Sequence, residues 1–189
     1  MQAVLAEFVT LLGFGLFASA AWWHFKGKSA PAMHLVAALS LLAFLLTEYE
    51  LFAPPVTHDT LPIGLALQIA SIGLFFAAIR ASRGAGFGVA FGGEDSDRIC
   101  TQGPYRYVRH PFYTSYMMFW IGCLLISPTM VLVGAVVAIT AMYFLAASRE
   151  ESYLLSTPAG AVYSEYQSRT GRFLPRLPVS IPGRVGRGS

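Results

Sequence analysis

The sequence predicts an all-α membrane protein with five transmembrane helices, and three observations support this fold class. Hydrophobic residues make up 55% of the 189-residue chain and charged residues only 12%, a balance outside the usual range of soluble proteins. Apolar stretches recur that approach the length of about 20 residues needed to cross a bilayer. All 13 basic residues fall in alternate connecting segments, as expected if those segments share one side of a membrane.

The hydrophobic segments begin near the N-terminus and end with a closely spaced pair. The first has no basic region before it and no clear cleavage site, which favours a retained helix over a signal peptide. The fourth is short and is joined to the fifth by Ser127, Pro128 and Thr129, where a proline fits a tight turn. We therefore expect the last two helices to form an antiparallel hairpin. In chain order, the expected segments are 3–23, 32–52, 61–79, 112–127 and 129–147.

The distribution of charge predicts an orientation. Five spans place the first loop, the third loop and the C-terminal tail on one face, and these carry two, five and six basic residues. Lys and Arg concentrate on the cytoplasmic side, so we expect the N-terminus outside and the C-terminus in the cytoplasm. The formal charge of +3 then follows from orientation, and no pattern favours nucleic acid. We expect one domain over 1–175 and a disordered basic tail over 176–189.

Two other features carry little functional information. Cys100 and Cys123 have no redox-motif or metal-ligand spacing, and no metal site is expected. The glycine-rich stretch from Gly84 to Gly93 superficially resembles a phosphate-binding loop. Such a loop works between a strand and a helix, which this chain does not offer, so a flexible or re-entrant connector is favoured.

The stretch "GPYRYVRHPFY", Gly103 to Tyr113, places polar residues at the start of the fourth helix. Pro111 suits the first position of that helix, whose free N–H groups and positive dipole end would face the cytoplasm. Flanked by Arg109 and His110, this end is suited to a carboxylate or a phosphate. The alternative interpretation is a basic membrane anchor with interfacial tyrosines.

A second polar group, Arg149-Glu150-Glu151, follows the fifth segment. Adjacent carboxylates at the end of a membrane helix are costly unless they reach water, a cation or a ligand. The hairpin should bring the two helix ends together, so His110 could approach Glu150 although 40 residues separate them. Alternatively, the glutamates are solvated and pair with arginines of the third loop.

Together, "GPYRYVRHPFYTSY", a hydrophobic hairpin, "REE", "YSEY" and "GRFLP" resemble the integral-membrane methyltransferases typified by isoprenylcysteine carboxyl methyltransferase and phospholipid N-methyltransferase. The resemblance covers about 97–175. It implies S-adenosylmethionine in a cytoplasm-facing pocket, with catalytic roles for Arg149 and Glu150. The residues implied to line the cofactor are Asp97, Arg98, Ile99, Cys100, Tyr105, His110, Pro111, Phe112, Tyr113, Glu150 and Glu151.

The sequence departs from this family at two positions. The isoprenylcysteine branch is expected to carry a substrate-facing arginine about a turn before the glutamates, whereas here only Arg149 is present, immediately before Glu150. This difference argues against a prenyl-cysteine carboxylate substrate. Ser115 stands where the family often has glycine, a small change.

The resemblance favours an enzyme that methylates a lipophilic acceptor. The acceptor would enter from the bilayer while the polar cofactor arrives from the cytoplasm, and only an amine acceptor would need a general base. Two alternatives stay open: an NADPH-dependent reductase of the sterol-reductase type and a non-catalytic membrane subunit. The adjacent glutamates favour the methyltransferase, and no polar set for a nicotinamide cofactor's phosphate is found.

Overall fold

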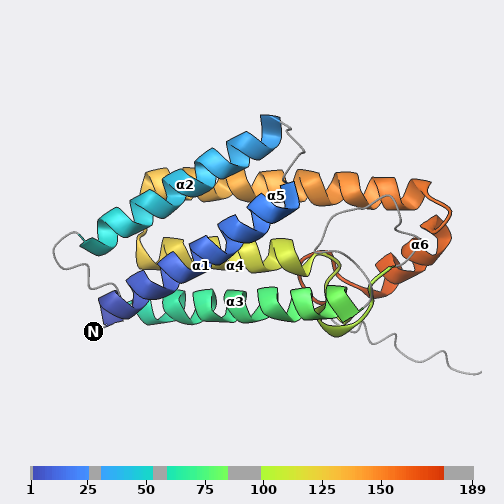
Figure 1. Cartoon of the computed structure of the whole chain (residues 1–189), viewed down its shortest axis with the longest axis horizontal. Helices are drawn as coiled ribbons and strands as arrows, with labels where there is room; N and C mark the ends of the chain where they lie inside the picture. Colours follow the sequence, from blue (N-terminus) through green and yellow to red (C-terminus); the bar gives the residue numbers. More distant parts are fainter. Residues whose placement is uncertain (1, 26–30, 53–58, 85–98, 177–189) are drawn as a thin grey trace, which may run out of the picture.

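The chain forms an all-α protein, as the sequence predicts. The computed structural model describes residues 2–25, 31–52, 59–84 and 99–176 (Figure 1). Across these ranges there is no β-sheet, and the sole strand-like contact is a bridge between Val108 and Gly171. The elements are α1 (Gln2–Phe25), α2 (Pro31–Phe52), α3 (Leu61–Gly84), the 3-10 helix η1 (Gly103–Arg106), α4 (Pro111–Ile126), α5 (Met130–Ser156) and α6 (Gly160–Arg169).

The five expected hydrophobic segments correspond to α1 to α5, but the sequence prediction missed two features. Helix α5 does not end at residue 147: it continues to Ser156, because the polar residues that follow, including two glutamates, are good helix formers. Helix α6 lies in the stretch expected to be a polar tail. Hydropathy identifies membrane-crossing stretches and gives no signal for a short polar helix. The glycine-rich stretch and the expected disordered tail fall largely outside the described residues.

Helices α1 to α5 alternate in direction along the long axis of the molecule (Figure 1). The starts of α1, α3 and α5 therefore lie at one end, together with the last turns of α2 and α4. The other end holds η1, the start of α4, the end of α5 and α6. This second end is where the two polar sequence groups meet.

Helices α3 and α4 pack closely along much of their length, and two glycines set their spacing. A Cβ atom on Gly64 would lie 2.7 Å from the carbonyl oxygen of Gly122, and one on Gly122 would lie 2.7 Å from Cγ of Gln68. Small residues at such a crossing allow membrane helices to approach backbone to backbone. The contact fixes α4 against α3 near the end of the molecule remote from α6.

A buried polar network joins three helices beside this crossing. Gln68 on α3 donates from Nε2 to Thr10 Oγ1 on α1 at 3.0 Å and to Cys123 Sγ on α4 at 3.3 Å. Thr10 in turn donates to the carbonyl of Ala6 at 2.8 Å. Buried polar groups without partners are costly, so these bonds hold the three helices in one register.

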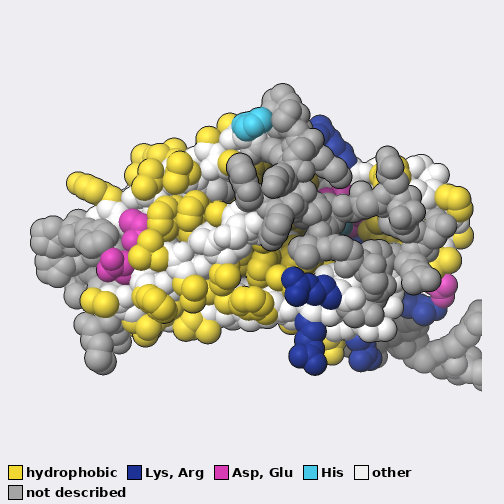
Figure 2. All heavy atoms as spheres, viewed as in Figure 1, with side chains coloured by type: hydrophobic (Ala, Val, Ile, Leu, Met, Phe, Trp, Pro, Cys, Tyr) yellow, Lys and Arg dark blue, Asp and Glu magenta, His cyan; other side chains and the backbone are white. Residues whose placement is uncertain are grey.

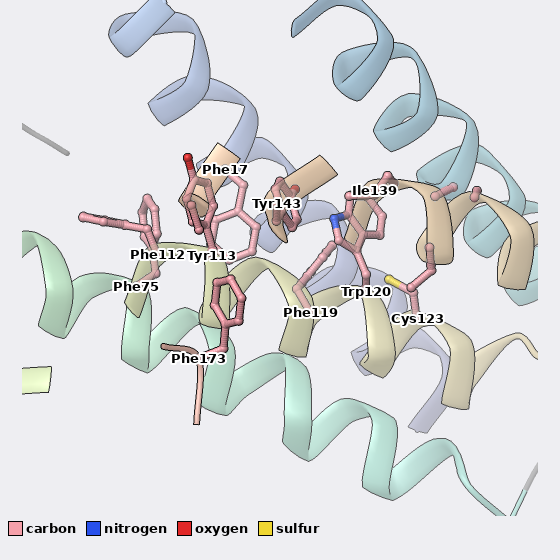
Figure 3. Packing of buried hydrophobic residues seen from close by; sticks show 14 of the residues in the cluster. Phe17, Phe75, Phe112, Tyr113, Phe119, Trp120, Cys123, Ile139, Tyr143 and Phe173 are labelled. Atoms are coloured by element: carbon pink, nitrogen blue, oxygen red, sulfur yellow. The ribbon is translucent and has the colours of Figure 1, made fainter. Parts of the chain in front are cut away.

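An aromatic core fills the centre of the bundle and continues to the site end (Figure 3). Phe75 of α3 packs on Phe112 of α4 with ring centroids 5.5 Å apart. Tyr113 stacks on Tyr143 of α5 at 5.4 Å. Phe173, from the segment after α6, belongs to the same cluster, so the C-terminal segment is anchored in the hydrophobic core.

Among the described residues, two helices are long and apolar enough to cross a bilayer: Leu61–Arg83 and Met130–Ser156. Shorter apolar helices occupy Val4–Ala20, His34–Tyr49 and Pro111–Ile126. Figure 2 shows hydrophobic side chains spread along the helices, with Lys and Arg gathered in the half nearer α6. The expectation of five spans stays a prediction.

The close crossing of α3 and α4 can be tested with a matched pair of alanine substitutions. Gly64→Ala places a methyl group against the backbone of α4, so we expect it to lower the free energy of unfolding by about 1–3 kcal/mol. Gly73→Ala, on the same helix, meets nothing within 4 Å and should be neutral or stabilising because alanine favours helix. Thermal unfolding in detergent measures both, and equal melting temperatures would contradict the crossing.

Candidate functional site

A short turn presents the start of α4 to the site. Gly103, the first residue of η1, adopts at φ 55° the left-handed conformation that glycine tolerates. The chain then reaches His110, the residue that caps α4, and Pro111, its first helical residue. The side chain of His110 makes no capping bond to the helix, so its ring is available for other contacts.

The segment after α6 lies along this turn, and we call residues 170–173 the C-terminal strap. Its backbone pairs with the turn: the N–H of Arg109 donates to the carbonyl of Gly171 at 2.8 Å, and that of His110 donates to the carbonyl of Arg172 at 3.1 Å. The side chain of Thr114 donates to the carbonyl of Phe173 at 3.0 Å. The strap therefore covers one side of the start of α4.

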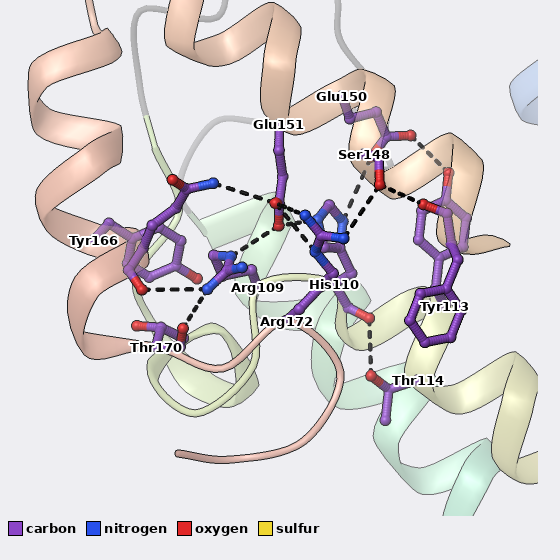
Figure 4. Close-up of polar contacts among 12 residues, drawn as sticks. Arg109, His110, Tyr113, Thr114, Ser148, Glu150, Glu151, Tyr166, Thr170 and Arg172 are labelled. Atoms are coloured by element: carbon purple, nitrogen blue, oxygen red, sulfur yellow. Dashed lines mark hydrogen bonds and ion pairs between the residues drawn. The ribbon is translucent and has the colours of Figure 1, made fainter.

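The carboxylate of Glu151 is the centre of the polar contacts (Figure 4). Its Oε1 accepts from Arg109 Nε at 2.8 Å and lies 3.0 Å from His110 Nε2. Its Oε2 accepts from Gln167 Nε2 at 3.2 Å, from Arg172 Nε at 3.1 Å and also from Nη2 of Arg172. With only 4% of its side chain exposed, Glu151 is fully engaged by protein donors.

Glu150 points to a different set of partners and remains accessible. The hydroxyl of Tyr113 donates to its Oε1 at 2.6 Å, and His110 Nδ1 lies 3.5 Å from its Oε2. About a third of its side chain, 34%, is exposed. Glu150 thus has a fixed orientation and can still accept further hydrogen bonds. Glu151 also has a fixed orientation, but its oxygens are already occupied by protein donors.

The ring of His110 lies between the two glutamates and carries a raised pKa. Burial by itself would lower the pKa, but hydrogen bonds and charge attraction from Glu150 and Glu151 outweigh it and raise the pKa above its ordinary 6.5. Protonation of the imidazole is therefore more favourable here than in a free side chain, because each ring nitrogen faces a carboxylate. His110 bridges the accessible and the buried glutamate.

The structure brings together four residues of the sequence-predicted site: His110, Tyr113, Glu150 and Glu151. The approach of His110 to Glu150, expected from the hairpin, is found at 3.5 Å. The alternative in which a glutamate pairs with a third-loop arginine also holds in part, because Arg109 binds Glu151. It is wrong about the solvation of Glu151, which is buried, while Glu150 remains partly exposed.

The other expected site residues lie around this group or outside it. Pro111 and Phe112 are buried, and Phe112 faces the aromatic core. The carbonyl of Tyr105 accepts from the hydroxyl of Tyr166 at 2.7 Å. Ile99 and Cys100 are half-buried, and Cys100 Sγ lies 3.7 Å from the carbonyl of Ala81. Asp97 and Arg98 lie outside the described residues.

Arg149 does not join the site contacts. It is exposed, and within the described part of the chain it makes no hydrogen bond or ion pair. Arg109 was expected beside His110 at the anion-binding start of the fourth helix, but Arg172 was not proposed from the sequence as a site member. Arg172 lies in the quoted "GRFLP" segment. The motif therefore contained this residue, but no role was assigned to it.

Comparison with known proteins gives a family. A family model described as phospholipid methyltransferase matches residues 60–157, just over half of the chain. The matched range runs from the start of α3 to the end of α5 and so includes the turn at His110 and both glutamates. A search of curated proteins found no match.

The raised pKa of His110 predicts how stability depends on pH. Because folding favours the protonated ring, its contribution to the free energy of unfolding is complete below pH 6.5 and is lost as the pH rises through the higher pKa of the folded state. We expect the melting temperature to fall over this interval and the fall to shrink in His110→Gln. His34→Gln, at an exposed position on α2, is the control. Identical pH profiles for all three proteins would contradict the prediction.

Proposed function

We propose that this chain, which belongs to the phospholipid methyltransferase family, methylates a phospholipid at the end of the bundle that holds His110 and Glu150. Members of the family are S-adenosylmethionine-dependent membrane enzymes, and the chain is accordingly a methyltransferase and an integral membrane protein. The observation that carries the proposed location is the accessible, oriented carboxylate of Glu150, whose Oε2 lies 3.5 Å from His110 Nδ1.

The residues at this end fit the chemical groups of S-adenosylmethionine. Glu150 can accept hydrogen bonds from ribose hydroxyls, and the positive end of the α4 dipole at His110 favours a carboxylate. The hydroxyl of Tyr113, which donates to Glu150 Oε1 at 2.6 Å, holds that carboxylate in place for the contact. When bound, the cofactor supplies a sulfonium-linked methyl group, and the protein contributes alignment and exclusion of water.

The proposed cofactor pocket extends beyond these three residues. Its lining combines the turn before α4, the first turn of α4 and the end of α5. The half-buried Ile99, Cys100 and Tyr105 support a wall on the η1 side. The full proposed lining adds Asp97, Arg98, Pro111 and Phe112 to the residues already named.

Arg149 is proposed to face the substrate. It directly precedes Glu150 on α5, is exposed, and has its charge uncompensated by any described side chain. An exposed guanidinium there is suited to the phosphate of a phospholipid headgroup. This role differs from the carboxylate contact expected in the isoprenylcysteine branch and agrees with the family assignment.

The proposed orientation places the site in the cytoplasm and the N-terminus outside, with five spans. Support comes from the charges of the described residues. Every described Lys or Arg lies toward the α6 end, whereas Glu7, Glu48 and Asp59 lie toward the other (Figures 1 and 2). Basic residues mark the cytoplasmic side. The described basic residues are Arg80, Arg83, Arg106, Arg109, Arg149, Arg169, Arg172 and Arg176.

Ligand-induced thermal stabilisation tests the proposed pocket. S-adenosylhomocysteine at a hundredfold excess over its Kd should stabilise the solubilised protein by about 2.7 kcal/mol, and NADPH should not stabilise it. Glu150→Gln should lose most of this shift, because the amide is a weaker partner for ribose hydroxyls and for His110. Glu165→Gln, an exposed change on α6, should keep it.

Radiolabelled methyl transfer into extracted phospholipids, compared with a prenylated cysteine mimic, then identifies the acceptor class. Label in the phospholipid fraction would support the proposal. Label in the mimic alone would contradict the proposal that a phospholipid is the methyl acceptor. If Glu150→Gln kept the full stabilisation by S-adenosylhomocysteine, the proposed place of Glu150 in the cofactor pocket would be contradicted.

A further inference from the structure

Glu151 has a different task from its neighbour Glu150. We propose that Glu151 is a positioning residue and not a cofactor ligand: it locks the C-terminal strap onto the start of α4 and aims the ring of His110 at Glu150. The proposal rests on the proposed function only for what His110 and Glu150 bind. The lock itself concerns residues of this chain alone.

The first argument is saturation of the Glu151 carboxylate. Each carboxylate oxygen offers about two acceptor sites. Oε1 is used by Arg109 and His110, and Oε2 by Gln167 and by two nitrogens of Arg172. A side chain that is 4% exposed and has both oxygens occupied leaves no place for a ribose hydroxyl.

The second argument is connectivity. The partners of Glu151 come from three segments: the turn before α4, α6 and the strap. The strap also contacts α5 through Arg172 Nη1, which donates to Ser148 Oγ at 3.2 Å, and through Phe173, which packs on Phe144. Arg109 also donates through Nη1 to the carbonyls of Gln167 and Thr170, which ties the turn to the end of α6. One carboxylate therefore closes a ring of contacts around the start of α4.

The third argument is the placement of His110. Its ring has Glu151 at one nitrogen and Glu150 at the other, while Phe173 of the strap lies against it with ring centroids 5.8 Å apart. The backbone N–H of His110 is held by the carbonyl of Arg172. Strap and Glu151 thus fix both the main chain and the ring of a residue that reaches Glu150.

The lock predicts opposite effects on the titration of His110. The charged groups around His110 are Glu150 and Glu151 from α5, Arg109 beside it and Arg172 from the strap, with Tyr113 stacked on its ring. Glu151→Gln removes an acceptor and leaves two arginines uncompensated, so the pKa of His110 should fall. Arg172→Gln removes a positive charge that compensates Glu151, so the pKa of His110 should rise.

The experiment combines histidine NMR titration with the Kd of S-adenosylhomocysteine, using the full chain in nanodiscs. Glu151→Gln should weaken binding on the order of tenfold, and the double variant Glu151→Gln/Arg172→Gln should be no worse than the single one, because the two residues act as a unit. Arg169→Gln, whose partner is the exposed Glu165, is the matched charge-removal control and should change neither quantity.

A neutral variant separates the lock from a general loss of folding. A Cβ atom on Gly171 would collide with the carbonyl oxygen of Leu174, so Gly171→Ala should displace the strap while every charged group is kept. We expect the same loss of affinity, with faster amide exchange at His110 and an otherwise protected bundle.

Two results would overturn the proposal. One is a loss of binding in Glu151→Gln with His110 titration and strap exchange unchanged, which would make Glu151 a direct ligand. The other is unchanged binding and titration in both Glu151→Gln and Gly171→Ala. If the wild-type chain bound no S-adenosylhomocysteine, the proposed function would fail, while His110 titration and strap exchange would still test the lock.

Discussion

The buried carboxylate of Glu151 is the interaction on which the site end of this protein depends. It accepts hydrogen bonds from two arginines and a glutamine and contacts a histidine, and these groups belong to segments far apart in the chain. Burying an ion pair gives little net stability by itself, but removing one partner leaves an unpaired buried charge and costs about 3–5 kcal/mol. Such an interaction therefore selects one arrangement of these segments more than it strengthens the fold.

The two adjacent glutamates differ in their surroundings: Glu151 is buried among protein donors, and Glu150 is partly exposed. Successive positions on a helix point about 100° apart, so one carboxylate can face the packed turn and strap while the next faces solvent. Glu150 keeps acceptor capacity because its neighbour satisfies the arginines, which would otherwise compete for it. The pair is thus a means of placing an accessible anion beside buried cations without neutralising it.

Much of the fold could be predicted from the sequence, because hydrophobic stretches separated by polar or proline-containing segments identify α1 to α5. The hairpin turn at Pro128 also predicted the approach of His110 to Glu150. The role of Arg172 and the contacts of Arg109 with α6 could not be derived in this way. They depend on α6, a polar helix without a hydropathy signal, and on a strap that pairs with residues about 60 positions earlier. The sequence also offered no indication that Gly64 and Gly122 matter. Their importance comes from the close approach of the α3 and α4 backbones at these two residues.

Helix α4 has 16 residues and so measures about 24 Å, less than the hydrocarbon thickness of about 30 Å. A bilayer meets such hydrophobic mismatch by thinning locally or by admitting polar groups below its surface. In the proposed five-span arrangement, His110 at the start of this short helix would lie at the depth of the lipid headgroups and not above them. A phospholipid could present its headgroup to the site without its acyl chains leaving the bilayer.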